Sequence, residues 1–352
     1  MTNSPFRFRD RIVPQIIPVV VGGALLFGLP QLLDLFTLLQ VTLYAIMAIL
    51  ALSLGFIWGY GGILCLGQSA FFGLGAYAYA IAAINIGEST IPFALALLLP
   101  AALAAAFGYF MFYGRISGVY VGVMTLTLAL ILFNVVNSTA GPEYHIGKAP
   151  IGGYNGLPNV PGLNLPFDPQ AQLDPVATYY LSGGLLLAVF FGLKWLLSTR
   201  FGRVVVAIRE NERRVEFIGF DARLHKLAAF TIGGALAGLA GCLFCVWGNY
   251  TSPVIFSMIQ SAQVIIWVMV GGVGTLLGPV LGAVALSWLT AEVGMQQLFD
   301  ANLLFGAVLV VFVLFVPRGL LPMLTERVWI RLARSPPRAP LSHSVTASGG
   351  SA

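Results

Sequence analysis

The chain has 352 residues, of which 58% are hydrophobic and only 9% are charged. Soluble domains carry roughly 25% charged residues, so the composition excludes a water-soluble globular protein and makes a lipid bilayer the expected surroundings. Lys and Arg exceed Asp and Glu, which gives a net charge of +5, but these residues lie between apolar runs and indicate no nucleic-acid partner. The runs are long and continuous, which predicts helices and argues against a transmembrane barrel.

Ten such runs predict an all-α fold, a polytopic transmembrane helical bundle of about ten spanning or partly spanning helices, because about 20 apolar residues cross the hydrocarbon core. The predicted segments are residues 12–33, 37–58, 61–84, 91–113, 118–139, 176–197, 226–247, 258–276, 278–293 and 302–317. The first is too long for the core of a secretion signal and has no small-residue cleavage site after it, so we expect it to be retained.

The basic residues predict the orientation of the bundle. With the N-terminus in the cytoplasm, every Lys and Arg except Lys148 falls at a cytoplasmic end or loop, as the positive-inside rule favours. This orientation divides the chain into a cytoplasmic N-terminal segment 1–11, a transmembrane domain 12–320, and a tail 321–352. The tail is expected to be cytoplasmic and disordered at its end.

Two connections are longer than turns. Residues 140–175 form an external loop rich in Gly, Pro and Asn, and a loop of this length is usually functional or mobile. Residues 198–226 form the longest cytoplasmic connection and have the pattern of an amphipathic helix, with Gly219 as a C-terminal stop. The apolar residues on one side of that helix are Val204, Ile208, Val215 and Ile218. Such a helix can lie on the membrane, meet a partner protein or be a solvated connector, and the pattern does not choose.

The cytoplasmic connection resembles the corresponding loop of the LivM-type permeases of branched-chain amino acid ABC transporters. The pattern "GR…AIRE…E…G…KL" is matched by Gly202, Arg203, Ala207, Ile208, Arg209, Glu210, Glu216, Gly219, Lys226 and Leu227. The resemblance implies that an ATPase-coupling loop includes Arg203, Ala207, Arg209, Glu210, Glu216 and Gly219. The chain departs from ABC importers generally at Arg213, Arg214 and Val215, where small residues are expected.

Two glycine-rich stretches carry the same resemblance. GYGGILCLGQSAFFGLGAY, residues 59–77, is similar to the family signature GxxSLGHAAFFGIGAY, and GGVGTLLGPVLGA, residues 271–283, matches GGxGxxxGPxxGA. Glycines permit close helix contact, and the second stretch predicts a turn or break at membrane depth. The residues expected to serve helix packing or a translocation path here are Gly67, Gly73, Gly271, Gly272, Gly274, Gly278 and Pro279.

Neutral polar side chains lie inside several predicted spans. They are Gln68, Asn134, Asn137, Gln260 and Gln263. Amides of this kind either hold helices together or line a translocation path, and both roles stay open for these residues. The centres of the spans carry no Asp, Glu, Lys or Arg, which argues against a proton relay or an ion-coupled carrier.

Motifs for other chemistry are not visible in the sequence. The motif GxxxxGK[ST] does not occur, so a pump of this kind must take its energy from a separate ATPase. The cysteines Cys65, Cys242 and Cys245 lie in apolar segments, where neither disulfides nor redox chemistry are expected. The scattered histidines, His145, His225 and His343, form no ligand set or triad. We therefore expect no enzyme activity, no cofactor and no metal.

The resemblance covers about residues 37–320 and implies a permease subunit of an ATP-binding-cassette importer in a bacterial inner membrane. Its implied cargo is a branched-chain or other hydrophobic amino acid. Its implied partners are a homologous second permease subunit, two cytoplasmic ATPase subunits and a periplasmic substrate-binding protein. A urea or short-amide permease of the same family remains an alternative, and so does an ATPase-independent channel or carrier.

Overall fold

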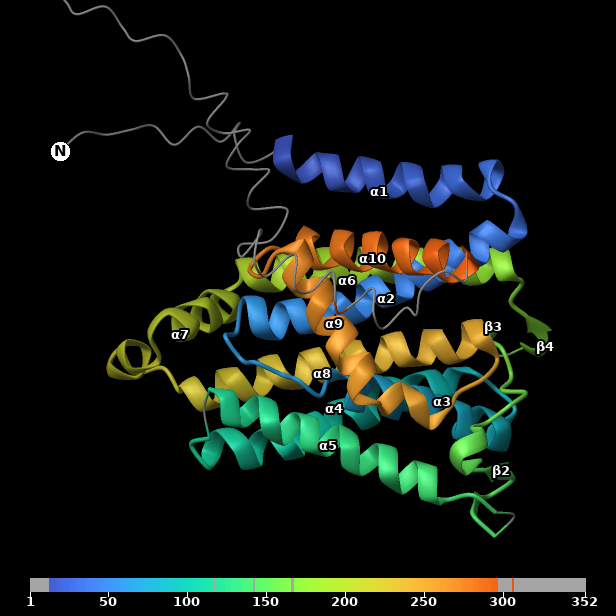
Figure 1. Cartoon of the computed structure of the whole chain (residues 1–352). Coiled ribbons are helices and arrows are strands. Elements are labelled where there is room, and N and C mark those ends of the chain that lie inside the picture. The colour runs from blue at the N-terminus through green and yellow to red at the C-terminus, as the bar shows by residue number, and fades with distance from the viewer. Residues whose placement is uncertain (1–12, 117, 142, 166–167, 297–305, 307–352) are drawn as a thin grey trace, which may run out of the picture.

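The computed structural model describes residues 13–116, 118–141, 143–165, 168–296 and 306. Within these residues the chain forms ten α-helices, most of which lie side by side in one bundle (Figure 1). The predicted all-α fold is confirmed. The N-terminal segment 1–11, the tail 321–352 and, apart from residue 306, the predicted segment 302–317 lie outside the described residues.

The helices follow the apolar runs closely. They are α1 (Val13–Leu32), α2 (Leu35–Gly59), α3 (Gln68–Ile86), α4 (Thr90–Tyr113), α5 (Val119–Ser138), α6 (Pro175–Ser198), α7 (Arg200–Phe217), α8 (Ala222–Gly248), α9 (Met258–Gly271) and α10 (Leu277–Gln296). Seven of them, α2 to α6, α8 and α10, are long and apolar enough to cross a membrane. With 14 residues, α9 is about 21 Å long, shorter than the roughly 30 Å of hydrocarbon.

The centre of the bundle is formed by α3 and α8, which pack against each other and against α2 and α4. Small residues permit this close packing. A Cβ atom added to Gly75 would lie 2.2 Å from the carbonyl oxygen of Gly238, and one added to Gly241 would lie 1.9 Å from that of Phe72. Because both contacts are with backbone, any larger residue at Gly75 or Gly241 would push the two helices apart.

The predicted segment 61–84 is helical only from the start of α3, which corrects the prediction of a span beginning at residue 61. The preceding residues pass through the bundle interior without helical structure, after a turn at Gly62, which has φ 66°. The backbone N–H groups of Leu66 and Gly67 donate to Oγ1 of Thr125 at 3.1 and 3.3 Å. Irregular backbone inside a membrane protein needs such partners, and here a side chain of α5 supplies them.

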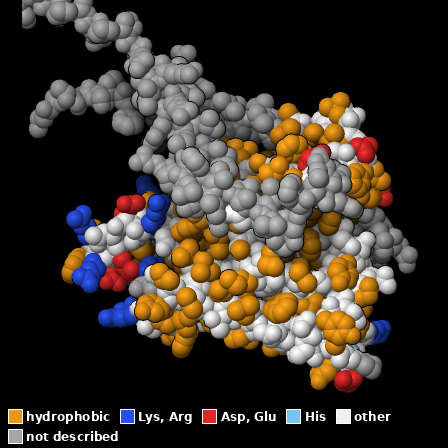
Figure 2. Space-filling view, viewed as in Figure 1, with side chains coloured by type: hydrophobic (Ala, Val, Ile, Leu, Met, Phe, Trp, Pro, Cys, Tyr) orange, Lys and Arg blue, Asp and Glu red, His pale blue; other side chains and the backbone are white. Residues whose placement is uncertain are grey.

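The two ends of the bundle differ. At one end α7 projects from the helices, and at the other lie four short strands (Figure 1). The strands are β1 (His145–Ile146), β2 (Ala149–Pro150), β3 (Asn164–Leu165) and β4 (Asp168–Gln172). They pair as two antiparallel hairpins, β1 with β2 and β3 with β4. Lys, Arg, Asp and Glu gather around α7, whereas hydrophobic side chains cover much of the middle of the visible face (Figure 2).

The long loop 140–175, at the strand end, packs onto the bundle. Leu157 and Thr251 exchange two backbone hydrogen bonds, of 2.7 and 3.1 Å. The Tyr79 hydroxyl of α3 donates to the carbonyl oxygen of Pro161 at 3.1 Å, and the Ser89 hydroxyl, just before α4, accepts from the Asn164 N–H at 2.9 Å. The described part of this loop is thus fastened to α3, to the start of α4 and to the segment after α8.

Candidate functional site

The segment predicted to meet an ATPase is centred on α7, which is not one straight helix. Its N-terminus is capped by Thr199, whose hydroxyl accepts from the Gly202 N–H at 3.4 Å. Asn211 has φ −160° and ψ 98°, which is not helical, and its Oδ1 accepts from the Arg214 N–H at 3.0 Å, as in a new helix cap. We call residues 200–210 the packed half of α7 and residues 212–217 the projecting half.

The apolar side of α7 is buried on both sides of Asn211 but not at the end of the helix. Ile208 and Val215 are buried, and Val204 packs partly against them, as the helical spacing predicts. The prediction for Ile218 is wrong, because its side chain is 75% exposed. Helical periodicity applies only within a helix, and Ile218 lies beyond Phe217, the last residue of α7.

The end of the projecting half presents large apolar side chains to the surroundings. We call this group the apolar tip; it consists of Phe217, Ile218, Phe220 and Leu224, with exposed fractions of 89%, 75%, 46% and 53%. A cavity of about 520 Å³ beside it is lined by Arg200, Arg203, Val204, Ala207, Val215, Ile218 and Phe220. Contiguous exposed apolar side chains of this kind mark a surface that another molecule covers.

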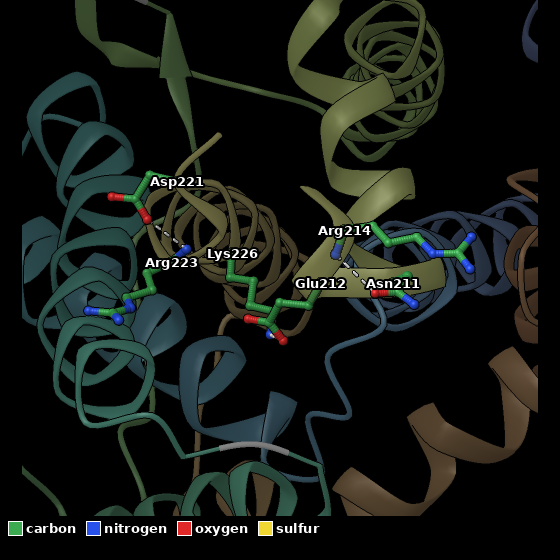
Figure 3. A network of polar contacts seen from close by, with 6 residues as sticks. All are labelled: Asn211, Glu212, Arg214, Asp221, Arg223 and Lys226. Carbon is green, nitrogen blue, oxygen red and sulfur yellow. Dashed lines mark hydrogen bonds and ion pairs between the residues drawn. The ribbon is translucent and has the colours of Figure 1, made fainter. Parts of the chain in front are cut away.

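Charged groups hold the projecting half against α8 (Figure 3). The Lys226 ammonium donates to Oε2 of Glu212 at 2.5 Å, forming an ion pair. At the start of α8, Oδ1 of Asp221 accepts from the backbone N–H of Arg223 at 2.9 Å. A cavity of about 230 Å³ next to this network is lined by Phe112, Arg115, Ile116, Glu212, Arg213, Glu216, Arg223 and Lys226. The end of α4 and the segment 198–226, both predicted to be cytoplasmic, therefore meet at the same end of the bundle.

The predicted coupling residues all lie at the α7 end of the bundle, and all of them are exposed. The exposed residues are Arg203, Ala207, Arg209, Glu210, Glu216 and Gly219. Arg209 differs from the others because its guanidinium reaches back to the bundle and donates to the Gly59 carbonyl oxygen at the end of α2. Burial raises the pKa of the neighbouring Tyr60 phenol, and the positive charge of Arg209 opposes that increase. The helical pattern placed Arg209 on the polar side and gave no sign of this contact.

The second glycine-rich stretch contains the predicted break. α9 ends at Gly271, and the following Gly272 and Gly274 have φ values of 117° and 94°, which side chains rarely adopt. Thr275 fixes the turn, since its Oγ1 donates to the Gly272 carbonyl oxygen and accepts from the Gly278 N–H, both at 3.1 Å.

Gly278 and Pro279, which follow the break, are buried and pack closely. A Cβ atom added to Gly271 would lie 1.9 Å from the Gly278 carbonyl oxygen, and Pro279 lies so close to α2 that a Cβ atom added to Gly55 would be 2.5 Å from its Cγ. The break therefore joins α9, α10 and α2 in one compact unit.

The first glycine-rich stretch lies in the interior. The Gln68 amide donates from Nε2 to Oγ of Ser53 at 2.8 Å and to the Gly233 carbonyl oxygen at 3.3 Å, which links α3 to α2 and α8. Cβ atoms added to Gly67 and Gly73 would collide with the Thr125 carbonyl oxygen and the Phe256 ring. These close contacts of Gln68, Gly67 and Gly73 are those of packed helices.

The other predicted amides lie elsewhere. Asn134 is exposed on α5, where its Nδ2 donates to the Leu130 carbonyl oxygen at 2.9 Å, and Asn137 is half-buried. Gln260 and Gln263 are half-buried on α9. The structure thus brings the predicted path residues to at least two places, one interior and one on the outer face of α5. Among the described residues, no three His, Cys, Asp or Glu side chains are grouped so that they could hold a metal ion.

Sequence comparison with known proteins finds matches over most of the chain. A family model described as "Branched-chain amino acid transport system / permease component" matches residues 36–316. The chain is 32% identical to the high-affinity branched-chain amino acid transport system permease protein LivM of Escherichia coli (strain K12), over 80% of this chain and 69% of that protein. The LivM protein of Salmonella typhimurium (strain LT2) is 31% identical over the same shares.

A more distant similarity extends to another kind of importer. The ribose import permease protein RbsC of Escherichia coli (strain K12) is 27% identical over 73% of this chain and 76% of that protein. No solved structure matches the chain.

Proposed function

The chain belongs to the permease family of branched-chain amino acid transport systems, and from this premise we propose that it is the membrane-spanning permease subunit of an ATP-driven importer for branched-chain or other hydrophobic amino acids. The observation that carries the proposal is the apolar tip at the end of α7. It stands away from the apolar middle of the bundle, among charged side chains, and is the surface on which we place an ATPase subunit.

The proposed mechanism assigns the energy source to separate subunits. The chain has no phosphate-cradling GxxxxGK[ST] loop, so two cytoplasmic ATPase subunits would bind at the α7 end and hydrolyse ATP. A periplasmic binding protein would deliver the amino acid at the strand end. The permease would then carry out a physical step, the reorientation of a path, without covalent chemistry.

The second permease subunit is assigned to the outer face of α5. Only 22% of the spanning part of α5 is buried within the chain, against 72% for α3 and for α8. The exposed side carries the polar Thr127, Asn134 and Ser138, whose side chains hydrogen-bond to the preceding turn of their own helix. Polar side chains at membrane depth favour contact with protein or a wet cavity over contact with lipid, which supports a subunit interface that borders the path.

The proposed orientation places the N-terminus, the C-terminus and α7 in the cytoplasm of a bacterial cell. The chain has three lysines, Lys148, Lys194 and Lys226, and only Lys148 belongs to the loop at the strand end. A membrane-impermeant amine reagent added to intact spheroplasts is expected to label this position, and Lys148→Arg should abolish the labelling. Labelling that persists in Lys148→Arg would overturn the orientation, because Lys194, Lys226 and the N-terminal amine would then be external.

The decisive experiment tests the apolar tip. Replacing both Phe217 and Ile218 by Ala should reduce recovery of the ATPase subunits with the tagged permease by about tenfold, because truncating two anchoring side chains at an interface costs at least 1 to 2 kcal/mol. The matched control is the double replacement of Leu98 and Leu99, exposed on α4, by Ala. Equal recovery of the ATPase from both variants would contradict the assignment.

Transport distinguishes the remaining alternatives. Uptake of labelled leucine, glutamate and urea by a deletion strain, with and without the restored gene, identifies the cargo. Uptake of leucine that stops when ATP is exhausted while ion gradients persist is the expected result. Uptake of urea alone would favour the short-amide alternative, and uptake that continues without ATP would favour a channel or carrier.

A further inference from the structure

The Arg209 side chain lies at a junction of three segments that are far apart in the sequence. Its guanidinium donates to the Gly59 carbonyl oxygen at the end of α2. A Cβ atom added to Gly62, in the turn after α2, would lie 3.0 Å from Cγ of Arg209, and one added to Gly274, in the break between α9 and α10, would lie 3.5 Å from Nη1. One side chain of α7 therefore contacts α2 and borders two non-helical segments at once.

The segments around Arg209 also touch each other. A Cβ atom added to Gly59 would lie 2.9 Å from the backbone nitrogen of Gly274, so the end of α2 and the break after α9 are in direct backbone contact. The last carbonyl groups of a helix carry partial negative charge, and a cation placed there is favourable. The guanidinium of Arg209 supplies that cation at the end of α2.

The non-helical residue of α7 is only two positions beyond Arg209. Asn211 separates the packed half, which carries Arg209, from the projecting half, which carries the apolar tip. The projecting half is tied to α8 by the ion pair of Glu212 with Lys226 (Figure 3). A displacement of the tip therefore has two routes into the bundle, one through Lys226 to α8 and one through Arg209 to α2 and the break.

We propose that Arg209 is a positioning residue that transmits displacement of the projecting half of α7 to the end of α2 and to the break between α9 and α10. This inference rests on the proposed function, since it presumes that an ATPase moves the tip. Arginine suits the role because its long side chain ends in a planar group with several donors, and one donor can hold the Gly59 carbonyl oxygen while the others face solvent. Arg203, also exposed on the packed half, has no side-chain hydrogen bond to another described residue.

The test uses the complete importer reconstituted in liposomes. Labelled leucine and the binding protein are supplied together on the side from which uptake occurs. Three quantities are measured: recovery of ATPase subunits with the permease, the rate of ATP hydrolysis, and the rate of leucine uptake. Arg209→Ala should leave ATPase recovery near the wild-type level and lower the ratio of leucine taken up to ATP hydrolysed by about tenfold, within the usual range of coupling between sites. Arg209→Lys should restore part of the ratio, because an ammonium group can still donate to the Gly59 carbonyl oxygen.

Two further variants keep the test independent of folding. Lys194→Ala is the matched control, because it removes a positive charge near the end of α6, outside the segment 198–226, and it should leave the ratio unchanged. Gly62→Ala keeps the positive charge, but its methyl group would lie against Cγ of Arg209 and should lower the ratio in the same direction. An unchanged ratio in Arg209→Ala, whether both rates persist or both fall together, overturns the inference. Failure of the wild-type permease to retain any ATPase would instead overturn the proposed function, and it is visible before any ratio is measured.

Discussion

The two glycine-rich stretches of this protein look alike in sequence and do different things in the structure. Around Gly75 the glycines sit in the continuous helix α3 and let it touch α8. Around Gly274 the helix ends, and Gly272 and Gly274 adopt positive φ values. Around Gly75 only the missing side-chain volume matters, whereas around Gly274, as at the turn of Gly62, the freedom of the backbone matters as well.

The difference teaches that glycine content in a membrane helix does not by itself indicate a break. Pro279 follows these glycines within the second stretch, and Gly271, Gly272 and Gly274 are spaced too tightly for a stable helix. In the first stretch, Ala and Phe lie between Gly67 and Gly73. Substitutions at the two places should therefore respond differently to the volume and to the backbone preference of the new residue.

The largest effect is expected for Gly75→Ala. Its Cβ atom would lie 2.2 Å from the Gly238 carbonyl oxygen, so α3 and α8 must separate. We expect a loss of roughly 3 kcal/mol in the free energy of unfolding, at the upper end of overpacking costs because the contact is with backbone. Thermal unfolding of the purified protein in detergent measures this effect. The matched control is Gly184→Ala in α6, where nothing lies within 4 Å of the added atom; equal melting temperatures for both variants would contradict the packing role.

A smaller effect is expected for Gly274→Ala. The added Cβ atom would have only ordinary contacts, at 3.5 Å and beyond, but the φ of 94° disfavours alanine, which costs about 1 to 2 kcal/mol. Asparagine tolerates positive φ better than alanine does, so Gly274→Asn should melt at a higher temperature than Gly274→Ala. At Gly75 the order should reverse, because asparagine is larger. The same order at both positions would remove the distinction between the two stretches.

The smallest effect is expected from the amides. Gln68→Leu removes two interior hydrogen bonds, to Ser53 and Gly233, and should cost about 1 kcal/mol. Asn134→Leu lies on the exposed face of α5 and bonds only within its own helix, so the melting temperature of the isolated subunit should stay within about 1 °C of wild type. A larger loss for Asn134→Leu than for Gln68→Leu would show that the interior and the outer face had been assigned the wrong way round.

Much of the fold was predictable because apolar length alone identifies a membrane helix. The break after Gly271 was also predictable, since glycine and proline disfavour helix at their own positions in the chain. The helix start at Gln68 was not, because the residues before it are apolar like a span, and hydropathy does not register a turn such as that at Gly62 or a hydrogen bond from Thr125.

For the candidate site, the position of the segment 198–226 between two helices of the bundle was predictable, whereas its contacts were not; its coupling role stays a prediction. The charge pattern and the resemblance identified the segment 198–226, whereas the end of α7 at Phe217, which leaves Ile218 exposed, was not predicted. The contact of Arg209 with Gly59 joins residues 150 positions apart, and only the packing of the whole bundle brings them together. A helical projection treats each helix in isolation and therefore cannot contain such a contact.

The fastening of the loop 140–175 constrains how such a molecule can open and close. The loop joins α3, the start of α4 and the segment after α8 through Pro161, Asn164 and Leu157. If these hydrogen bonds stay intact while access alternates, the strand end can move only a little. The larger displacements of these helices must then occur at the opposite end, where α7 lies.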